Sequence, residues 1–340
     1  MRILIFTQKI DKTDSILGFF CGWVSELSKK YDSITVVCLE KGIYDLPENV
    51  TVYSLGKEDG VGKVGYLYKF YHYLYTIKDS YDAVFVHMNQ EYVLLGGLYW
   101  KFKNIPVYLW RNHPYGNLST RIAISLSSEV FYTSPMSFTA KYKNAKIMPV
   151  GINLDIFKPS SVYSRKKHSV CMLGRISPIK GVHLGLQAIK ILLDTGNQVS
   201  FTIVGSPLPK DELYYASLKN FVNENQLGSY VSFIDSVPQN MVPEIFNSHE
   251  IYLNLTEDGS FDKTIVEAPA CGAVPVVSNK SLKDMLPETC FTARDPESVA
   301  EALKVALSPE YRVKIQKPLE EFVKTHSLEG LISKLVESIK

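Results

Sequence analysis

The segment 254–277 carries a polar glycine turn followed by a predicted short helix with an acid inside it. Gly259 and Ser260 lie in the turn, and Glu267 falls among small and apolar residues of the helix. A helix that begins directly after such a turn offers free backbone N–H groups and the positive end of its dipole to an anion. An acid one or two turns further along can reach hydroxyls of the same ligand. The pattern therefore favours a phosphorylated sugar or a nucleotide over a peptide or a lipid tail.

A second segment, 173–181, places Arg175 and Lys180 between a predicted strand and a predicted helix. Arginine binds phosphate as a fork and lysine as a point charge, so two such cations at the mouth of a strand suit a diphosphate. The alternative interpretation is a solvated basic loop. Because ligands bind beyond the carboxyl ends of parallel strands, we expect this segment to lie beside the turn at 259–267, which favours the diphosphate.

Continuous apolar runs rich in Val, Ile and Phe recur along the chain and alternate with segments of helical period. The runs are 3–7, 34–39, 83–87, 107–110 and 130–133 in the first half, and 170–173, 200–204, 231–234, 251–255 and 274–277 in the second. Such runs are typical of strands covered on both faces, and their alternation with helices predicts parallel sheets of right-handed βαβ units. Each half is therefore predicted to be a Rossmann-like α/β domain, and the two domains are expected to face each other across a cleft.

The boundary between the halves is predicted within 148–161, which is rich in turn-forming residues. We expect an N-terminal domain over 1–150 and a C-terminal domain over 151–315. The tail from Pro296 onward has the pattern of two or three helices. Residues 316–340 are expected to pack back toward the N-terminal domain.

Composition argues against several classes of function. The chain has 340 residues and a formal net charge of +2, which is too weakly basic to indicate nucleic acid as a partner. No apolar run is long enough to span a bilayer, and the first residues have the pattern of a buried strand rather than a signal peptide. The five cysteines are odd in number and scattered, which indicates reduced thiols in a cytoplasmic protein.

Four motifs together resemble those of the retaining glycosyltransferases of family 4, the glycosyl transferases group 1, which have the GT-B fold. The pattern Gly-Arg-x-x-x-x-Lys-Gly matches 174–181. The pattern Glu-Ala-x-Ala-x-Gly-x-Pro-Val is matched by 267–276 with one extra residue before Pro275, and Pro269 stands where the family usually has Met. Residues 204–207 resemble its Val-Gly-x-Gly-Pro turn, shortened by one residue, and 150–159 resemble its hinge signature. The resemblance covers nearly the whole chain and is most specific in the second half.

By this resemblance the first domain is the acceptor side and the second domain binds a nucleotide-sugar donor. Arg175 and Lys180 would neutralise the donor diphosphate, which is the leaving group, and Glu267 would bind the ribose hydroxyls. His113 would contact the donor sugar, unless it is a loop histidine without a role. The implied donor-binding residues are Gly18, Gly174, Gly205, Ser206, Ser236, Val237, Gly259, Ser260, Phe261, Asp262, Lys263, Thr264 and Glu267.

One position departs from the family pattern. Many members have a Glu eight positions before the second Glu of the motif, and here that position is Gly259. Backbone N–H groups of 260–264 could still hold the sugar and the phosphate, and Asp262 or Glu257 could supply the missing carboxylate. For Asp262 the alternative is a helix N-cap, which is favoured at such a position. Whether the departure at Gly259 lowers the activity stays open.

The resemblance also implies a route for the reaction. The sequence has no Asp-x-Asp metal motif with suitable flanks, and side chains can supply the cations for the phosphates. A metal-independent transfer is therefore expected, with no cofactor beyond a UDP- or GDP-linked sugar as co-substrate. The configuration at the anomeric carbon would be retained by same-face attack. Catalysis would then come mainly from positioning and from charge stabilisation at the leaving group.

The acceptor side is less clearly encoded. Asn89, Glu91 and Arg111 follow predicted strands of the first domain and are candidate acceptor contacts, although Asn89 and Glu91 could instead cap the next helix. Residues 61–78 contain five tyrosines, three lysines and no acid. This segment is interpreted either as an interfacial helix that contacts a membrane or a lipid acceptor, or as an amphipathic helix packed on the first sheet.

The expected acceptor is a glycan or a lipid-linked molecule, in the synthesis of a polysaccharide, a glycolipid or a cell-envelope glycan. The expected location is cytoplasmic, at the inner face of a membrane if 61–78 contacts lipid. Two other functions share the architecture: a catalytically weak or inactive nucleotide-sugar-binding protein, which Gly259 motivates, and a sugar-nucleotide epimerase. A nicotinamide oxidoreductase is disfavoured because the first βα turn lacks Gly-x-Gly-x-x-Gly.

Overall fold

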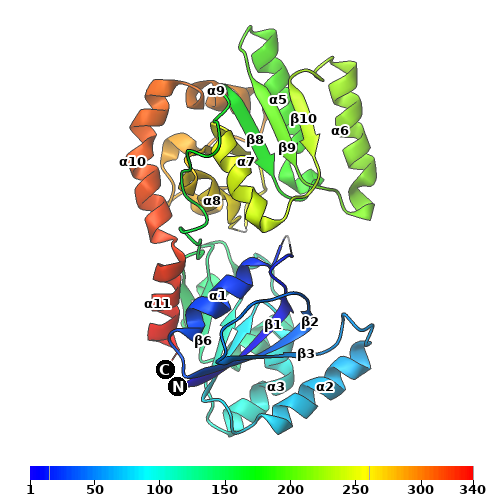
Figure 1. Cartoon of the computed structure of the whole chain (residues 1–340), viewed down its shortest axis with the longest axis vertical. Helices are drawn as coiled ribbons and strands as arrows, with labels where there is room; N and C mark the ends of the chain where they lie inside the picture. The colour runs from blue at the N-terminus through cyan, green and yellow to red at the C-terminus, as the bar shows by residue number, and fades with distance from the viewer. Residues whose placement is uncertain (15, 260, 340) are drawn as a thin grey trace. The chain divides into compact units, whose positions relative to one another are not determined.

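The computed structural model describes residues 1–14, 16–259 and 261–339, and it divides into two compact units (Figure 1). Unit 1 comprises 1–151 together with the residues from 328 onward, and unit 2 comprises 152–327. The division at 151 lies one residue beyond the predicted end of the first domain.

Within the described residues, unit 1 is built on a seven-stranded sheet of order β3-β2-β1-β4-β5-β6-β7, and all neighbouring strands are parallel. The strands are β1 (Arg2–Ile10), β2 (Ser33–Lys41), β3 (Val50–Ser54), β4 (Ala83–His87), β5 (Val107–Trp110), β6 (Glu129–Tyr132) and β7 (Ala145–Ile147). The sequence predicted five of them. It missed the two edge strands, because β3 is only partly buried and β7 has three residues, two of them exposed.

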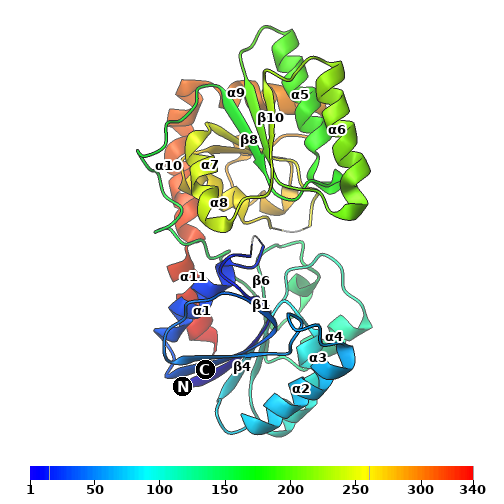
Figure 2. The same ribbon diagram turned by 45° about the vertical axis from the view of Figure 1, so that its right-hand side comes forward.

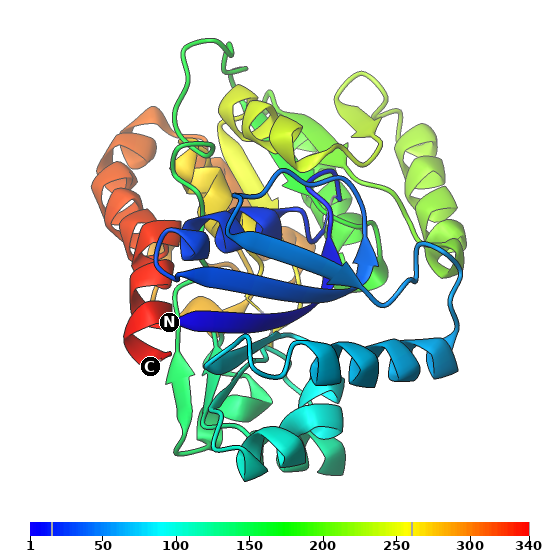
Figure 3. The same cartoon turned by 60° about the horizontal axis from the view of Figure 1, so that its bottom comes forward.

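Helices cover both faces of this sheet (Figure 3). Because side chains alternate along a strand, Ile3 and Ile5 of β1 face one layer, while Leu4 and Phe6 face the other. The first layer contains α1 (Phe19–Ser28) and α11 (Leu328–Ser338). The second layer contains α2 (Lys63–Thr76), α3 (Glu91–Phe102) and α4 (Leu118–Ser125).

In the described part of unit 2 the sheet has five parallel strands in the order β10-β9-β8-β11-β12 (Figure 2). Its strands are β8 (Ser169–Leu173), β9 (Ser200–Val204), β10 (Val231–Ile234), β11 (Ile251–Asn254) and β12 (Val274–Val277), each at a predicted position. Its helices are α5 (Val182–Asp194), α6 (Glu212–Glu224), α7 (Val242–Ser248), α8 (Thr264–Ala270), α9 (Pro296–Ala306) and α10 (Pro309–Thr325). Short 3₁₀ turns are η1 (Phe138–Lys141) in unit 1 and η2 (Pro178–Lys180), η3 (Pro209–Asp211), η4 (Gln239–Met241), η5 (Lys280–Leu282) and η6 (Glu288–Cys290) in unit 2.

The two C-terminal helices belong to different units. α10 packs on α8 and α9 of unit 2, whereas α11 packs on α1 of unit 1. Leu331 and Leu335 of α11 are fully buried in one cluster with Trp23 of α1. Thus only the residues from 328 onward, rather than all of 316–340, complete the core of unit 1.

Each sheet has one point where the order of its strands reverses. In unit 1 this point lies between β1 and β4, and in unit 2 it lies between β8 and β11. Ligands of open α/β sheets bind in the crevice beyond the carboxyl ends of the strands at such a point. The prediction of two Rossmann-like parallel-sheet units is confirmed. In the part of the chain that the structure describes, no helix has the length and hydropathy needed to cross a bilayer.

Candidate functional site

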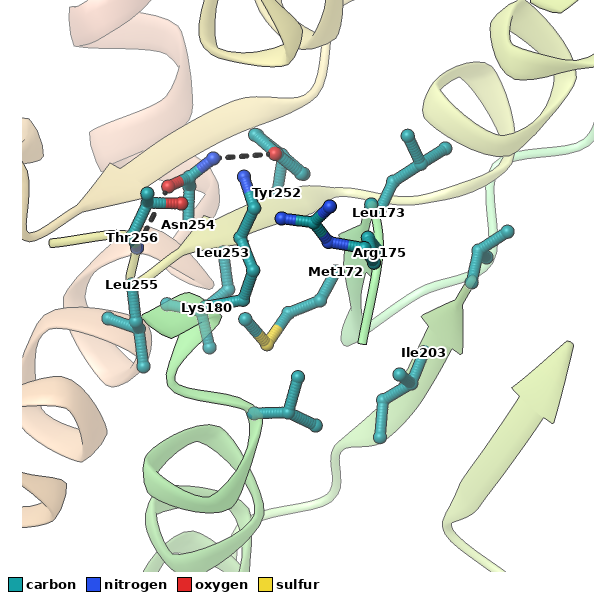
Figure 4. A pocket seen from close by; sticks show the side chains of 13 residues that line it. Met172, Leu173, Arg175, Lys180, Ile203, Tyr252, Leu253, Asn254, Leu255 and Thr256 are labelled. Atoms are coloured by element: carbon teal, nitrogen blue, oxygen red, sulfur yellow. Dashed lines mark hydrogen bonds between the residues drawn. The ribbon is translucent and has the colours of Figure 1, made fainter. Parts of the chain in front are cut away.

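The two cations predicted to bind a diphosphate lie on the loop that follows β8 (Figure 4). Arg175 is exposed, and the Lys180 side chain is 23% exposed. Both line a hollow at the carboxyl ends of β8, β9 and β11, at the reversal point of the unit 2 sheet. Lys180 Nζ lies 2.5 Å from Asp262 Oδ2, on the loop that leads from β11 into α8. The two segments that the sequence predicted to be neighbours are therefore in direct contact.

Asp262 accepts hydrogen bonds from several side chains around the end of β11. Asn254 Nδ2 donates to Oδ2 at 3.1 Å, Thr256 Oγ1 to Oδ2 at 3.4 Å, and Thr264 Oγ1 to Oδ1 at 3.0 Å. The hydroxyl of Tyr252 joins the network, 2.8 Å from Asn254 Nδ2 and 2.6 Å from Thr264 Oγ1. The carboxylate is therefore fixed in position before any ligand binds.

Lys180 and this network decide the charge of Asp262. Burial alone would raise the pKa of the carboxyl group, but the Lys180 ammonium and the hydrogen bonds outweigh burial and hold the pKa below its usual value. The N-cap position of α8 is Lys263, whose own side chain forms no capping hydrogen bond. The structure therefore does not use Asp262 as an N-cap; its carboxylate pairs with the predicted phosphate-binding lysine.

Gly205 brings the loops after β8 and β9 into close contact. A Cβ added at Gly205 would lie 1.9 Å from the carbonyl oxygen of Gly174, and the φ of Gly205 is +148°. Only glycine combines that backbone conformation with so close an approach. Since Gly174 immediately precedes Arg175, this contact helps to set the position of the arginine.

Glu267 lies in the first turn of α8 and is 6% exposed. Burial raises the pKa of Glu267 and lowers the pKa of Lys263, and the attraction between the two side chains opposes both shifts. Hydrogen-bond donors to a buried carboxyl group favour its ionised form. Ligand hydroxyls at Glu267 would therefore lower its pKa.

The turn before α8 carries the predicted sugar-binding residues. The backbone N–H of Gly259 donates to Ser281 Oγ at 2.9 Å, and the φ of Gly259 is +123°. Ser260 lies outside the described residues. Phe261 is 8% exposed and packs edge-on against His326, with 5.1 Å between the ring centroids. This turn is thus anchored on both sides within unit 2.

The residues predicted to frame the base follow β9 and β10. The Ser236 backbone N–H donates to Ser206 Oγ at 3.1 Å, and Gly205 N–H donates to the carbonyl of Ile234 at 2.9 Å. Ser236 is exposed and Val237 is half-buried. These residues lie at the same edge of the sheet as the cation loop.

The residues predicted in the first domain lie at the carboxyl edge of the unit 1 sheet. Gly18 is the N-cap of α1, the helix that follows β1. Asn89 follows β4, and Glu91 is the exposed first residue of α3. The N-cap of α3 is Gln90, without a side-chain capping bond, so neither Asn89 nor Glu91 acts as the cap.

Arg111 and His113 follow β5. Arg111 Nε donates to Gln90 Oε1 at 2.9 Å and Nη2 donates to the carbonyl of Tyr115 at 2.8 Å, while burial lowers the pKa of the guanidinium. His113 is exposed, and its Nδ1 lies 3.1 Å from the backbone nitrogen of Tyr115. Arg111 thus braces the loop that carries His113.

Sequence reasoning missed two features of the unit 2 site. The first is the polar group around Asp262 formed by Tyr252, Asn254 and Thr256. These three polar residues alternate with apolar ones at the end of a strand, and this pattern could have predicted that they share one face. The second is Arg294. Its Nε donates to the carbonyl of Leu255 at 3.0 Å and its Nη2 to the carbonyl of Pro178 at 3.3 Å, which ties the loops after β11 and β8 together. No local pattern marks Arg294.

The chemistry of this site suits an anion with hydroxyl groups. Arg175 and Lys180 supply positive charge at the mouth of the hollow, Asp262 is paired with Lys180, and Glu267 is buried in the first turn of α8. Among the described residues, no group of three or more His, Cys, Asp or Glu side chains is arranged to hold a metal ion.

Residues 167–308 match the family model of the glycosyl transferases group 1. This range lies within unit 2 and contains the cation loop, the Asp262 network and Glu267. The resemblance to group 1 glycosyltransferases is confirmed for this part of the chain.

Curated relatives and solved structures agree with that match. The chain is 23% identical over 166 residues to the phosphatidylinositol N-acetylglucosaminyltransferase GPI3 subunit of Saccharomyces cerevisiae, covering 46% of this chain and 36% of the relative. It is 25% identical to a phosphatidylinositol N-acetylglucosaminyltransferase subunit of Arabidopsis thaliana, covering 48% and 36%. The chain thus spans 36% of the length of each of these relatives. These matches support the predicted enzyme class, a glycosyltransferase, for the part of the chain that they cover.

The crystal structure of Anabaena HepE in complex with UDP is similar over the whole chain. The TM-score is 0.80 at 17% identity, covering 100% of this chain and 99% of that one. At this identity the similarity establishes the fold, which is that of the GT-B glycosyltransferases.

Proposed function

We propose that the protein is a retaining, metal-independent glycosyltransferase that moves a sugar from a nucleoside-diphosphate donor to a hydroxyl group of a glycan or a lipid-linked acceptor. The observation that carries the proposal is the direct contact between the Arg175–Lys180 loop and the turn before α8, with Glu267 buried behind that turn.

The diphosphate would bind at Arg175 and Lys180. Arg175 is exposed and forms no ion pair with any residue in the described ranges, so its guanidinium is available as a fork for phosphate oxygens. Lys180 is partly neutralised by Asp262. A diphosphate, which carries two negative charges, can therefore compete with that single carboxylate, and the ammonium would then contact both.

The nucleoside would bind beside the diphosphate. In the proposed complex Glu267 would accept hydrogen bonds from the ribose hydroxyls, and this contact would offset the burial that raises its pKa. The base would bind at the edge formed by Gly205, Ser206 and Ser236, where the hydrogen bond from Ser236 N–H to Ser206 Oγ holds the two loops together. The UDP and UDP-glucose complexes of HepE support a uridine donor.

The acceptor and the location are parts of the proposal supported by other observations. The names of the yeast and plant relatives describe sugar transfer to phosphatidylinositol, which favours a lipid-linked acceptor and glycolipid synthesis. The five cysteines are free and buried, which suits the reducing cytoplasm.

The proposed catalysis is electrostatic. As the bond to the sugar breaks, negative charge grows on the diphosphate beside Arg175 and Lys180, and fixed cations stabilise that charge without reorganisation. The acceptor hydroxyl attacks on the face from which the diphosphate leaves and its proton passes to the departing phosphate oxygen, so the configuration is retained. Because side-chain cations neutralise the leaving group, this route uses no metal ion.

The test replaces each cation in the purified chain. Arg175→Ala and Lys180→Ala should each lower the release of UDP from a UDP-sugar by about 10²–10³-fold, the range for loss of one preorganised charge contact. Lys190→Ala is the matched control, because Lys190 lies on the next helix and pairs only with Asp194 among the described residues. If Arg175→Ala and Lys180→Ala both keep the activity of the control variant, the proposal is wrong.

Gly259 favours one second candidate, a nucleotide-sugar-binding protein without turnover. No side-chain carboxylate is available at that position, and neighbouring Asp258 binds the Lys280 backbone N–H at 2.6 Å. A panel of UDP- and GDP-sugars separates the candidates. Tight binding of a donor without hydrolysis or transfer would favour the binding protein, whereas slow donor hydrolysis would favour the enzyme.

A further inference from the structure

One surface of unit 1 exposes an unusual number of large apolar side chains. It is the outer side of α2, α3 and α4, here called the three-helix face. Its exposed apolar residues are Val64, Leu67, Tyr68, Tyr71, Tyr75, Leu98, Phe102, Leu118 and Ile122. Clustered exposed apolar side chains of this kind mark interaction sites, whereas single ones need no explanation.

α2 has two distinct apolar sides. Phe70 and Leu74 are buried against the sheet, as expected of an amphipathic helix that packs on it. Val64, Tyr68 and Tyr75 recur at helical spacing on another side and are 85%, 72% and 73% exposed. Packing on the sheet explains the buried side of α2 but not the exposed stripe of Val64, Tyr68 and Tyr75. The amphipathic interpretation of 61–78 therefore accounts for only one side of this helix.

The stripe continues onto the neighbouring helices. The Tyr71 hydroxyl donates to the carbonyl of Leu95 at 3.2 Å, which joins α2 to α3, and α3 packs against α4 (Figure 2). Leu98 and Phe102 of α3 are 71% and 83% exposed. The three-helix face is thus one surface rather than three separate patches.

The charges on this face are mostly positive. Within the three helices and the three residues after each, the exposed cations are Lys63, Lys78, Lys101, Lys103 and Arg121, and the exposed acids are Asp79 and Glu91. Glu58 and Asp59 are exposed in the turn before α2. α2 and α4 contain no acid, and Glu91 is the first residue of α3. Lys78 Nζ lies 4.9 Å from the centroid of the Tyr75 ring. Aromatic rings and cations therefore share one surface.

We propose that the three-helix face docks on a membrane that contains anionic lipids. Tyrosine and phenylalanine rings enter the boundary between head groups and acyl chains, while lysine and arginine reach lipid phosphates from the rim. The excess of one charge sign favours an anionic lipid surface over a second copy of this chain, whose identical face would be repelled. The proposal goes beyond the transfer reaction and does not rest on it.

The test measures sedimentation of the full chain with vesicles. Vesicles of phosphatidylcholine mixed with phosphatidylglycerol should bind the protein, and vesicles of phosphatidylcholine alone should bind it much more weakly. The variant Lys63→Gln/Lys101→Gln/Arg121→Gln should lose affinity for the anionic vesicles by about a hundredfold, since each cation near such a surface contributes a factor of about five. Tyr68→Ser/Tyr75→Ser/Phe102→Ser should lose about tenfold or more.

Two controls keep the test decisive. Leu213→Ser/Val313→Ser removes equally exposed apolar side chains from unit 2, 88% and 75% exposed, and should bind vesicles like the unmodified chain. Melting curves verify that each variant is folded. Equal binding to neutral and anionic vesicles, equal loss in the unit 2 control, or a dimer in solution that the Tyr68→Ser/Tyr75→Ser/Phe102→Ser variant abolishes would each overturn the proposal.

Discussion

Replacing Gly205 by alanine tests whether the contact between the loops after β9 and β8 holds the cation loop in place. The added Cβ would lie 1.9 Å from the Gly174 carbonyl oxygen and 2.9 Å from its carbon, at a φ of +148°. The overlap can be relieved only by moving backbone. Because Gly174 precedes Arg175, we expect Gly205→Ala to reduce both the stability of unit 2 and its affinity for UDP.

The size of the effect follows from a comparison with Gly196, which has a φ of +82° and no atom within 4 Å of an added Cβ. Gly196→Ala therefore carries only the cost of the left-handed conformation, about 1–2 kcal/mol. Gly205→Ala adds steric overlap, typically about 1–3 kcal/mol, and the total is about 2–5 kcal/mol. At about 2–4 °C per kcal/mol, Tm should fall by roughly 4–20 °C for Gly205→Ala and by roughly 2–8 °C for Gly196→Ala.

The assay is calorimetric melting of the full chain, followed by UDP titration of both variants below their melting temperatures. Gly205→Ala should weaken UDP binding by about tenfold or more, because displaced cations lose their alignment, and Gly196→Ala should leave it unchanged. If the two variants melt together and bind UDP equally well, the close approach at Gly174 has no part in positioning Arg175, and the reasoning fails.

Three further predictions concern charge and packing. Asp262→Asn should destabilise unit 2 by about 1–3 kcal/mol at neutral pH, because it leaves Lys180 facing an amide. The lowered pKa of Asp262 stabilises the fold above its unfolded value of about 3.9, so the difference in Tm should shrink as pH falls below about 4; a constant difference would contradict this. Glu267→Gln should weaken UDP binding by about tenfold or more while binding of inorganic pyrophosphate, which has no ribose, is unchanged; equal losses would disprove the ribose contact. Leu331→Ala should destabilise unit 1 by about 2–5 kcal/mol and exposed Ser333→Ala should not, as melting curves would show.

The sequence predicted the parts of the site that depend on short stretches of chain. Arg175 and Lys180 could be predicted from the sequence because a buried strand ends directly before them, and parallel topology brings strand ends to one edge. Glu267 could be predicted because it is an acid inside an otherwise apolar helix. Contacts between residues far apart in the sequence could not be predicted. Asp262 lies 82 positions from Lys180, and its role as an ion-pair partner rather than an N-cap depends on how two loops meet.

The same limit applies to the fold. Strands buried on both faces, such as β4, were predicted because their whole length is apolar. The edge strands β3 and β7 were missed because β3 is only partly buried and two of the three residues of β7 are exposed, so neither has a continuous apolar run. Arg294 is an example within the site of a residue that the sequence could not predict. Its guanidinium joins two loops through their carbonyl groups, and no sequence pattern marks such a contact.

The position of α11 has a consequence for synthesis on the ribosome. Residues 152–327 form unit 2, and only afterwards does the chain supply Leu331 and Leu335 to the core of unit 1. At about 5–20 residues per second, the 1–151 segment waits roughly 10–40 s for its last helix. During that time the surface of α1 around Trp23 has no permanent cover, so the nascent first unit is a natural client for chaperones, and fragments that end before α11 should aggregate.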